Sequence, residues 1–354
     1  MTKKKSSRSG CLARIGRIFL WLVIILTLLL AAGYIYQRQT TAADFEQFPA
    51  PGQRVDVGGY SLHIHCMGEG SPTVIVDAGN GDFSLGWSGV QPEVAKFARI
   101  CTYDRAGYGW SDPSPKPRTA EAMAEELHTL LSNTGIEPPY VLVGHSLGGY
   151  NVRMFADLYP NEVAGMVLVD AGHEDQLNRF PPEYAKLNQQ QVSYLSVMGF
   201  MSRFGILRAM GNSSGGADFA PPQVLKMPKD IQPLYMAMMS HPAYFDATLG
   251  ELQALTETTD QLRATHTLGD LPLIVLTAES TLDAAALQSI GMPADFDTNQ
   301  IQQVWLELQA ELAALSTNSE HIVVKDSAHA IQLDQPQAVI DAIRKVVGMA
   351  MEEK

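Results

Sequence analysis

The sequence predicts an α/β protein with a mostly parallel central sheet, and two observations carry that prediction. Continuously apolar segments such as residues 73–78 (TVIVDA) and 163–169 (VAGMVLV) are typical of strands that are buried on both faces. Segments with helical spacing separate these strands, which is the pattern of parallel strands joined by crossover helices. The chain has 354 residues, enough for one large α/β domain or two ordinary ones.

The first 36 residues have the pattern of a membrane anchor. Residues 1–17 form a basic tail with no acidic residue, and residues 18–36 (IFLWLVIILTLLLAAGYIY) carry no charge. An apolar run of this length can cross a bilayer as a helix. The excess of basic residues before it places the N-terminus in the cytoplasm and the rest of the chain outside, which predicts a single-pass protein of the cell membrane.

A cleaved signal peptide is the alternative reading of the same residues, because it also combines a basic start, an apolar run and small residues. The run is longer than a usual signal core, and Ala31-Ala32-Gly33 is a poor cleavage site, so we favour an uncleaved anchor. Residues 37–53 are polar and contain two prolines, and we expect them to be a linker to a domain at 54–354.

The charge of the chain is unevenly distributed. The whole chain carries −13, and because residues 1–37 contribute +6, the remainder carries −19. A domain this acidic is not expected to bind nucleic acid, and anionic lipid headgroups should repel it.

From residue 54 onward, strand and helix patterns alternate with one long interruption. The expected strands are 54–57, 60–67, 73–78, 98–103, 140–143, 163–169, 273–277 and 321–324. The expected helices are 84–97, 119–132, one following residue 146 and ending near 159, 301–315 and 336–349. Residues 171–270 lack a convincing buried strand and are rich in methionine, so we expect a helical cap there. Methionine suits a lining for apolar ligands and an ordinary core equally well.

The segment 140–150 (YVLVGHSLGGY) has the form of a nucleophile elbow. An apolar strand meets a Gly-x-Ser-x-Gly turn, and a helical pattern follows at once. The glycines on either side of Ser146 fit a turn too tight for side chains. This context makes Ser146 a candidate nucleophile, which needs a base because a serine hydroxyl holds its proton at neutral pH.

The chain resembles proteins of the α/β-hydrolase fold from about residue 54 to its C-terminus. The segments that carry the resemblance are DAGNGDFSLGW (77–87), YDRAGYGWSD (103–112), VGHSLGG (143–149), VLVDAGHED (167–175) and DSAHAIQLDQP (326–336). The resemblance implies an α/β-hydrolase fold with the cap inserted between the sixth and seventh strands, preceded here by one transmembrane helix.

The resemblance also implies a Ser-Asp-His triad with Ser146 as nucleophile and His329, just after the last strand, as base. The acid usually follows the seventh strand, where the chain offers Glu279 and Asp283, but neither stands in the usual G-x-x-D pattern. Some relatives, including certain haloalkane dehalogenases, place it after the sixth strand, which Asp170 terminates. We expect Asp170, with Asp283 as the alternative, to orient the histidine.

An oxyanion hole is implied at two backbone N–H groups, those of Leu147 and Asn80. Asn80 lies in a loop that corresponds to the His-Gly-x segment of the family, although Ala78 replaces the histidine. The loop can also be laid against the dehalogenase loop whose asparagine helps to hold halide. Dehalogenases and epoxide hydrolases use an aspartate nucleophile, however, so Ser146 indicates acyl chemistry.

The remaining histidines suggest no metal site, and we expect neither a metal nor a cofactor. The side chain of His145 should point away from the line of attack on the substrate. His63 and His65 face one side of a strand, but two ligands are too few for a metal. His173 and its two acidic neighbours read as a polar loop, because consecutive residues rarely converge on one ion.

The resemblance places the strands of Cys66 and Cys101 side by side. A disulfide between them is geometrically reasonable in an oxidising compartment, and Cα atoms more than 7 Å apart would rule it out. Cys11, on the cytoplasmic side, is read as a free thiol.

These observations predict a membrane-anchored serine hydrolase, a carboxylesterase or lipase-like enzyme that acts on an apolar small-molecule acyl substrate. Acyl transfer, cofactor-free perhydrolysis and peptide cleavage would use the same residues. A non-catalytic ligand-binding protein of the same fold is a further alternative, since fold alone does not determine function.

Overall fold

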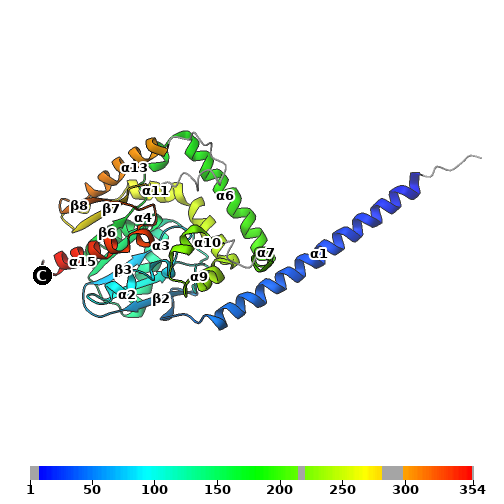
Figure 1. Cartoon of the computed structure of the whole chain (residues 1–354), viewed down its shortest axis with the longest axis horizontal. Helices are drawn as coiled ribbons and strands as arrows, with labels where there is room; N and C mark the ends of the chain where they lie inside the picture. Colours follow the sequence, from blue (N-terminus) through cyan, green and yellow to red (C-terminus); the bar gives the residue numbers. More distant parts are fainter. Residues whose placement is uncertain (1–7, 214–219, 281–297, 353–354) are drawn as a thin grey trace, which may run out of the picture.

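A single eight-stranded sheet forms the centre of the computed structural model, which describes residues 8–213, 220–280 and 298–352 (Figure 1). The strand order is β1-β2-β4-β3-β5-β6-β7-β8. The strands are β1 (Gln53–Asp56), β2 (Ser61–Met67), β3 (Thr73–Asp77), β4 (Ile100–Asp104), β5 (Tyr140–His145), β6 (Val163–Val169), β7 (Leu273–Ala278) and β8 (Ser319–Val324). Among the strands of the described residues, only the pairs β1–β2 and β2–β4 are antiparallel, so the prediction of a mostly parallel sheet is confirmed.

Helices cover both faces of this sheet. The longer ones are α1 (Arg8–Gln47), α3 (Ala120–Thr134), α4 (Leu147–Leu158), α6 (Pro182–Arg203), α7 (Ile206–Ser213), α9 (Gln232–Met239), α10 (Pro242–Gln253), α11 (Leu255–Arg263), α13 (Thr298–Ala313) and α15 (Pro336–Glu352). The short ones are η1 (Ser84–Trp87), α2 (Gln91–Val94), η2 (Pro160–Glu162), α5 (Gln176–Arg179), α8 (Pro222–Lys226) and α14 (Ile331–Asp334). The core packs α3, α4 and α11 against one face of the sheet and α2 and α15 against the other.

Alternation along the buried strands explains the two cores. Val141 and Val143 of β5 face the core that α15 completes, whereas Leu142 faces the core of α3 and α4. Successive side chains of a strand point to opposite faces, so a continuously apolar strand is needed where both faces are covered. The described residues between β6 and β7 form the helices α5 to α11 and contain no strand.

The expected linker at residues 37–53 is wrong for its first eleven residues, because α1 continues to Gln47. No glycine or proline interrupts residues 34–48, and the helix ends just before Pro49, as is usual ahead of proline. An ion pair between Asp44 and Arg208 of α7 (2.6 Å) also holds this part of α1 against the domain. Within the described part of the chain, α1 is the one helix long and apolar enough to cross a membrane.

The single helix expected at residues 84–97 is also wrong, since η1 and α2 replace it. Gly86 and Gly89 lower helix propensity inside that segment, and Pro92 begins a new helical turn. By contrast, α3 begins as expected after Thr119, whose hydroxyl accepts a hydrogen bond from the Ala122 N–H.

Cys66 and Cys101 face each other across the antiparallel pair β2–β4 and form a disulfide, with their Cα atoms 4.0 Å apart. The bond joins residues that are 35 positions apart in sequence. It therefore ties the first hairpin of the domain to the centre of the sheet.

Replacing both Cys66 and Cys101 by alanine should lower the free energy of unfolding by about 2–4 kcal/mol, because the unfolded chain gains loop entropy. Urea unfolding of the full chain in detergent measures this. Reductant should lower the stability of the wild type and leave the double variant unchanged. Titration of more than one free thiol in the unreduced, denatured wild type would contradict the disulfide, since only Cys11 should react.

Candidate active site

Ser146 sits at a sharp turn between β5 and α4. Its backbone has φ 51° and ψ −118°, a conformation that a residue with a side chain adopts only where its surroundings impose it. The surroundings are tight: a Cβ at Gly148 would clash with the backbone oxygens of Asp77 and Ala78 at the end of β3. The glycine therefore lets the first turn of α4 lie directly against the sheet and presents Ser146 at its edge.

Three side chains from different elements form one line of hydrogen bonds. His329, in the loop between β8 and α14, has its Nε2 atom 2.9 Å from the Ser146 Oγ. Its Nδ1 atom lies 2.6 Å from Oδ2 of Asp170, the residue that follows β6. The carboxyl ends of parallel strands meet at one edge of the sheet, which explains why residues so far apart in sequence converge.

Asp170 is fully buried and has a donor for each carboxylate oxygen. Its Oδ1 accepts hydrogen bonds from the Ala278 N–H (2.9 Å) and the Trp305 indole N–H (2.8 Å), and its Oδ2 faces His329. A buried carboxylate requires such partners. The contact from Trp305, on α13, cannot be predicted from the sequence, because a helical pattern does not indicate which distant residue an indole contacts.

The alternative acids are placed differently. Asp283 lies outside the described residues. Glu279 is exposed, and its carboxylate accepts a hydrogen bond from the Asp326 N–H (2.9 Å) in the loop that precedes His329.

His145 lies beside the histidine of the site and does not face Ser146 as a partner. Its Nε2 atom is 2.9 Å from the backbone oxygen of His329, and the two rings are 4.8 Å apart. Burial, together with the nearby His329, lowers the pKa of His145 to about 3. The ring is therefore neutral at physiological pH and donates its Nε2–H to the loop that carries His329.

The loop of Gly79, Asn80 and Gly81 passes next to Ser146. A Cβ at Gly79 would come within 3.2 Å of the Ser146 Cβ. The Gly79 oxygen accepts hydrogen bonds from Arg105 Nη2 (2.8 Å) and from the Asp82 N–H (3.1 Å). In a trans peptide the N–H points opposite to the C=O, so the Asn80 N–H points away from Arg105.

The side chain of Asn80 is used elsewhere. Its Nδ2 donates to Glu251 Oε2 (2.8 Å) and to the Thr248 backbone oxygen (3.1 Å), both on α10. The Asn80 side chain contacts α10, so the comparison with the dehalogenase asparagine that helps to hold halide does not apply to it. The oxyanion donor expected from the sequence is the backbone N–H of Asn80, not this side chain.

Arg105 joins the sheet, this loop and α10 at one buried point. Its guanidinium contacts Asp77 Oδ1 (2.6 Å) and Glu251 Oε1 (2.7 Å), and it donates to the Ala78 oxygen (2.5 Å). The two carboxylates outweigh the effect of burial and raise the pKa of Arg105 well above its usual value. Arg105 belongs to the YDRAGYGWSD segment, but its link to α10 could not be read from that motif.

His63 and His173, two of the other histidines singled out in the sequence, have structural partners. His63 is buried, with Nδ1 2.8 Å from Asp104 and Nε2 2.5 Å from the Pro51 oxygen. The ring of His173 accepts the Asp175 N–H, whereas Glu174 pairs with Arg153 (2.7 Å).

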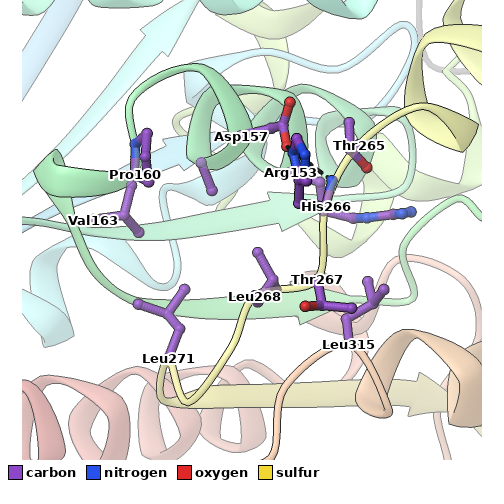
Figure 2. A pocket seen from close by; sticks show the side chains of 11 residues that line it. Arg153, Asp157, Pro160, Val163, Thr265, His266, Thr267, Leu268, Leu271 and Leu315 are labelled. Atoms are coloured by element: carbon purple, nitrogen blue, oxygen red, sulfur yellow. Dashed lines mark hydrogen bonds and ion pairs between the residues drawn. The ribbon is translucent and has the colours of Figure 1, made fainter.

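A separate pocket of about 210 Å³ lies at the other end of the sheet (Figure 2). Its lining includes Val163 at the start of β6 and Leu271 just before β7, together with His266, which pairs with Asp157 (2.9 Å). Ser146 and Asp170 occupy the opposite, carboxyl ends of the strands, so this pocket is not part of the candidate site.

A family model described as the alpha/beta hydrolase fold matches residues 72–233, from the residue before β3 into the cap. Two solved structures superpose on nearly all of the domain. A thermophilic esterase from Thermogutta terrifontis is 23% identical over 85% of this chain and 99% of the esterase (TM-score 0.58). The epoxide hydrolase CorEH is 19% identical over 83% of this chain and 97% of its own (TM-score 0.60). The chain is therefore an α/β-hydrolase-fold protein.

The curated relatives are similar in sequence over different lengths. The chain is 26% identical to the uncharacterized protein YqjL of Bacillus subtilis, over 84% of this chain and 92% of YqjL. The match to YbdG of the same organism covers 52% of this chain and 55% of YbdG, at 27% identity. The match to "Probable transporter efuK" of Hormonema carpetanum, at 34% identity, covers only 23% of that protein. The chain thus spans about half or less of these last two relatives.

Asp82, next to the Asn80 loop, should make stability depend on pH. Burial raises its pKa to about 6, although hydrogen bonds from the Phe83 N–H and the Tyr235 hydroxyl lower it. Between its unfolded value of 3.8 and about 6 the folded state holds the proton more tightly, so stability falls as pH rises through this window. Because the side chain is partly exposed, we expect a penalty of about 1–2 kcal/mol.

The variant Asp82→Asn lacks this penalty, so it should gain stability relative to the wild type between pH 4 and 6. Urea midpoints measured across that range test the expectation. Asp230→Asn, the same charge change at an exposed site, serves as the control. Parallel pH profiles for the wild type and Asp82→Asn would show that Asp82 ionises normally.

Proposed function

We propose that this protein is a serine hydrolase that cleaves carboxylic esters through an acyl-enzyme intermediate. The observation that carries the proposal is the continuous hydrogen-bonded line from Ser146 through His329 to Asp170. A serine with a base at 2.9 Å, and a base with a buried carboxylate behind it, is the arrangement that activates a hydroxyl nucleophile.

In the first half of the reaction, the Nε2 atom of His329 takes the proton of Ser146 as Oγ bonds to the acyl carbon. Asp170 stabilises the imidazolium and remains ionised. The N–H groups of Asn80 and Leu147 donate hydrogen bonds to the carbonyl oxygen and stabilise the negative charge that develops there. The C–O bond to the alcohol then breaks, and His329 returns the proton to the departing alcohol.

In the second half, His329 removes a proton from water, which attacks the acyl carbon. The bond to Ser146 Oγ breaks, Oγ regains the proton from His329, and the carboxylic acid leaves. The same acyl-enzyme could react with an alcohol, a peroxide or a peptide amine. Product analysis with these acceptors separates an esterase from the acyltransferase, perhydrolase and peptidase readings.

The serine also supports ester cleavage over epoxide opening. The fold is shared with the epoxide hydrolase CorEH, but fold likeness at 19% identity carries no chemistry. The resemblance described above assigns epoxide hydrolases an aspartate nucleophile, and this chain has serine at the elbow. We infer an apolar acyl group from the methionine-rich cap and propose that the protein needs no cofactor.

We further propose that α1 anchors the enzyme in the cell membrane with the catalytic domain on the outside. The basic tail and the uncharged run at 18–36 support this topology, as does an 18-residue apolar stretch of α1 that contains no buried residue. The disulfide between Cys66 and Cys101 supports an oxidising compartment for the domain.

A fluorophosphonate probe should label the full chain at Ser146, because the activated Oγ attacks phosphorus as it attacks an acyl carbon. Labelling should vanish in Ser146→Ala, whereas Ser84→Ala, at another buried serine, should label normally. A series of p-nitrophenyl esters of increasing acyl length, tested on the same preparations, then measures the preference for apolar acyl groups. Folded wild type that neither labels nor hydrolyses any ester would overturn the proposal.

The identity of the acid can be decided by two matched substitutions. Asp170→Asn should lower kcat about 10³–10⁴-fold, because the amide no longer stabilises the imidazolium or fixes its tautomer. Asp283→Asn should retain kcat within a few-fold. Ester hydrolysis by the two variants gives the answer, and the reverse pattern would assign the acid to Asp283.

A further inference from the structure

The cap touches α1 inside its apolar run. Phe204 and Gly205 form the corner between α6 and α7, and this corner packs on one turn of α1. A Cβ at Gly33 would clash with the Phe204 oxygen, and a Cβ at Gly205 would come within 2.7 Å of the Tyr36 ring. Gly33 and Tyr36 both belong to the uncharged segment 18–36.

Polar contacts fix this arrangement just beyond the apolar run. Asp44 of α1 accepts hydrogen bonds from Arg208 of α7 (2.6 Å) and from His241 (3.1 Å). About two helical turns before Asp44, the Gln37 side chain donates to the Ser240 oxygen (3.1 Å). The cap is thus held to α1 by the corner at Gly33 and Tyr36 and by these polar contacts beyond it, which together fix its position along α1.

The segment 187–213, which forms this corner, carries exposed apolar side chains and contains no acidic residue. Tyr194, Val197 and Phe200 lie at helical spacing on α6 and are 60%, 54% and 52% exposed. On α7, Ile206 is also exposed. Residues 187–213 contain no Asp or Glu, although residues 38–354 carry a net charge of −19. Arg203 and Arg208, the only charged residues of that segment, pair with Asp246 and Asp44.

A shallow, open groove of about 560 Å³ lies beside the contact between α1 and the corner. Its walls are formed by Ala32 and Gly33 on α1 and by Phe204, Ile206 and Ala209 on the cap side. An apolar groove of this kind, open beside a helix that crosses a membrane, suits a lipid acyl chain better than water.

The depth of the corner follows from helix geometry. Gly33 lies three residues inside the end of the apolar run, or about 4.5 Å along the helix axis. Interfacial helices bury their apolar faces about 5–10 Å into the headgroup and acyl boundary. In Figure 1, α6 and α7 form the side of the domain from which the N-terminal part of α1 leads away, and α6 runs across the direction of α1.

We propose that the exposed face of α6 and the α6–α7 corner are immersed in the leaflet on the domain side of the membrane, and that the groove beside α1 takes a lipid acyl chain. The proposal rests on the proposed anchoring by α1 and is independent of the chemistry at Ser146. It gives the protein a second membrane contact, made by the cap itself.

Site-specific fluorescence in vesicles tests this contact. In the full chain with Cys11→Ser, single cysteines at Phe200, Ile206, Ile35 and Val323 are labelled with an environment-sensitive dye while the disulfide stays oxidised. The chain is reconstituted in phosphatidylcholine vesicles with or without nitroxide-bearing acyl chains. Ile35 reports on α1 (55% exposed), and Val323 on β8 (47% exposed) is the matched control away from the cap. Each labelled variant must retain the wild-type melting curve.

We expect the nitroxide lipids to reduce the fluorescence at Ile35, Phe200 and Ile206 by about two-fold or more and to leave Val323 unchanged. Quenching at Ile35 alone would overturn the cap contact and leave the anchor standing. No quenching at any position would overturn the anchor and the cap contact together. Ester hydrolysis by the same preparations reports separately on the proposed activity.

Discussion

The site and the cap both depend on the contacts that the buried guanidinium of Arg105 makes. It contacts a carboxylate from the sheet (Asp77), a carboxylate from α10 (Glu251) and two carbonyls of the loop that precedes Asn80. Removing one partner of a buried ion pair costs about 3–5 kcal/mol, because a charge is left without compensation. The loop, the end of β3 and the cap therefore hold their positions together, and the Asn80 N–H is oriented by contacts on the side away from Ser146.

Strand ends supply the rest of the site. Ser146 and Asp170 both have positive φ values and both follow directly after neighbouring parallel strands, β5 and β6. The Ser146 backbone N–H donates to the Val169 oxygen (3.2 Å), and the Ser146 backbone oxygen accepts a hydrogen bond from the Gly172 N–H (2.9 Å). These backbone hydrogen bonds connect the two turns directly and fix Ser146 and Asp170 relative to each other.

The parts of this structure that sequence could predict are those encoded locally. The elbow at Ser146 and the strand that ends at Asp170 are continuous segments with their own period and turn chemistry. The contacts that complete the site are not local: Trp305 reaches Asp170 from 135 residues away, and Glu251 reaches Arg105 from 146 residues away. The extension of α1 to Gln47 escaped prediction for the same reason, since its polar residues find partners on the cap and resemble a linker until those partners are known.

The acidity of the domain constrains how it meets a membrane. A net charge of −19 over residues 38–354 predicts repulsion from anionic headgroups, and long-range repulsion of that kind favours any orientation that keeps the acidic surface away from lipid. The acid-free segment around Phe200 and Ile206 lies on the side where α1 leaves the domain. The charge distribution and the exposed apolar side chains therefore both favour the face of α6 as the one that would meet a membrane. Because α10 carries Glu251 and packs along α6, the membrane contact proposed for α6 would be linked through one further helix to the loop of Asn80.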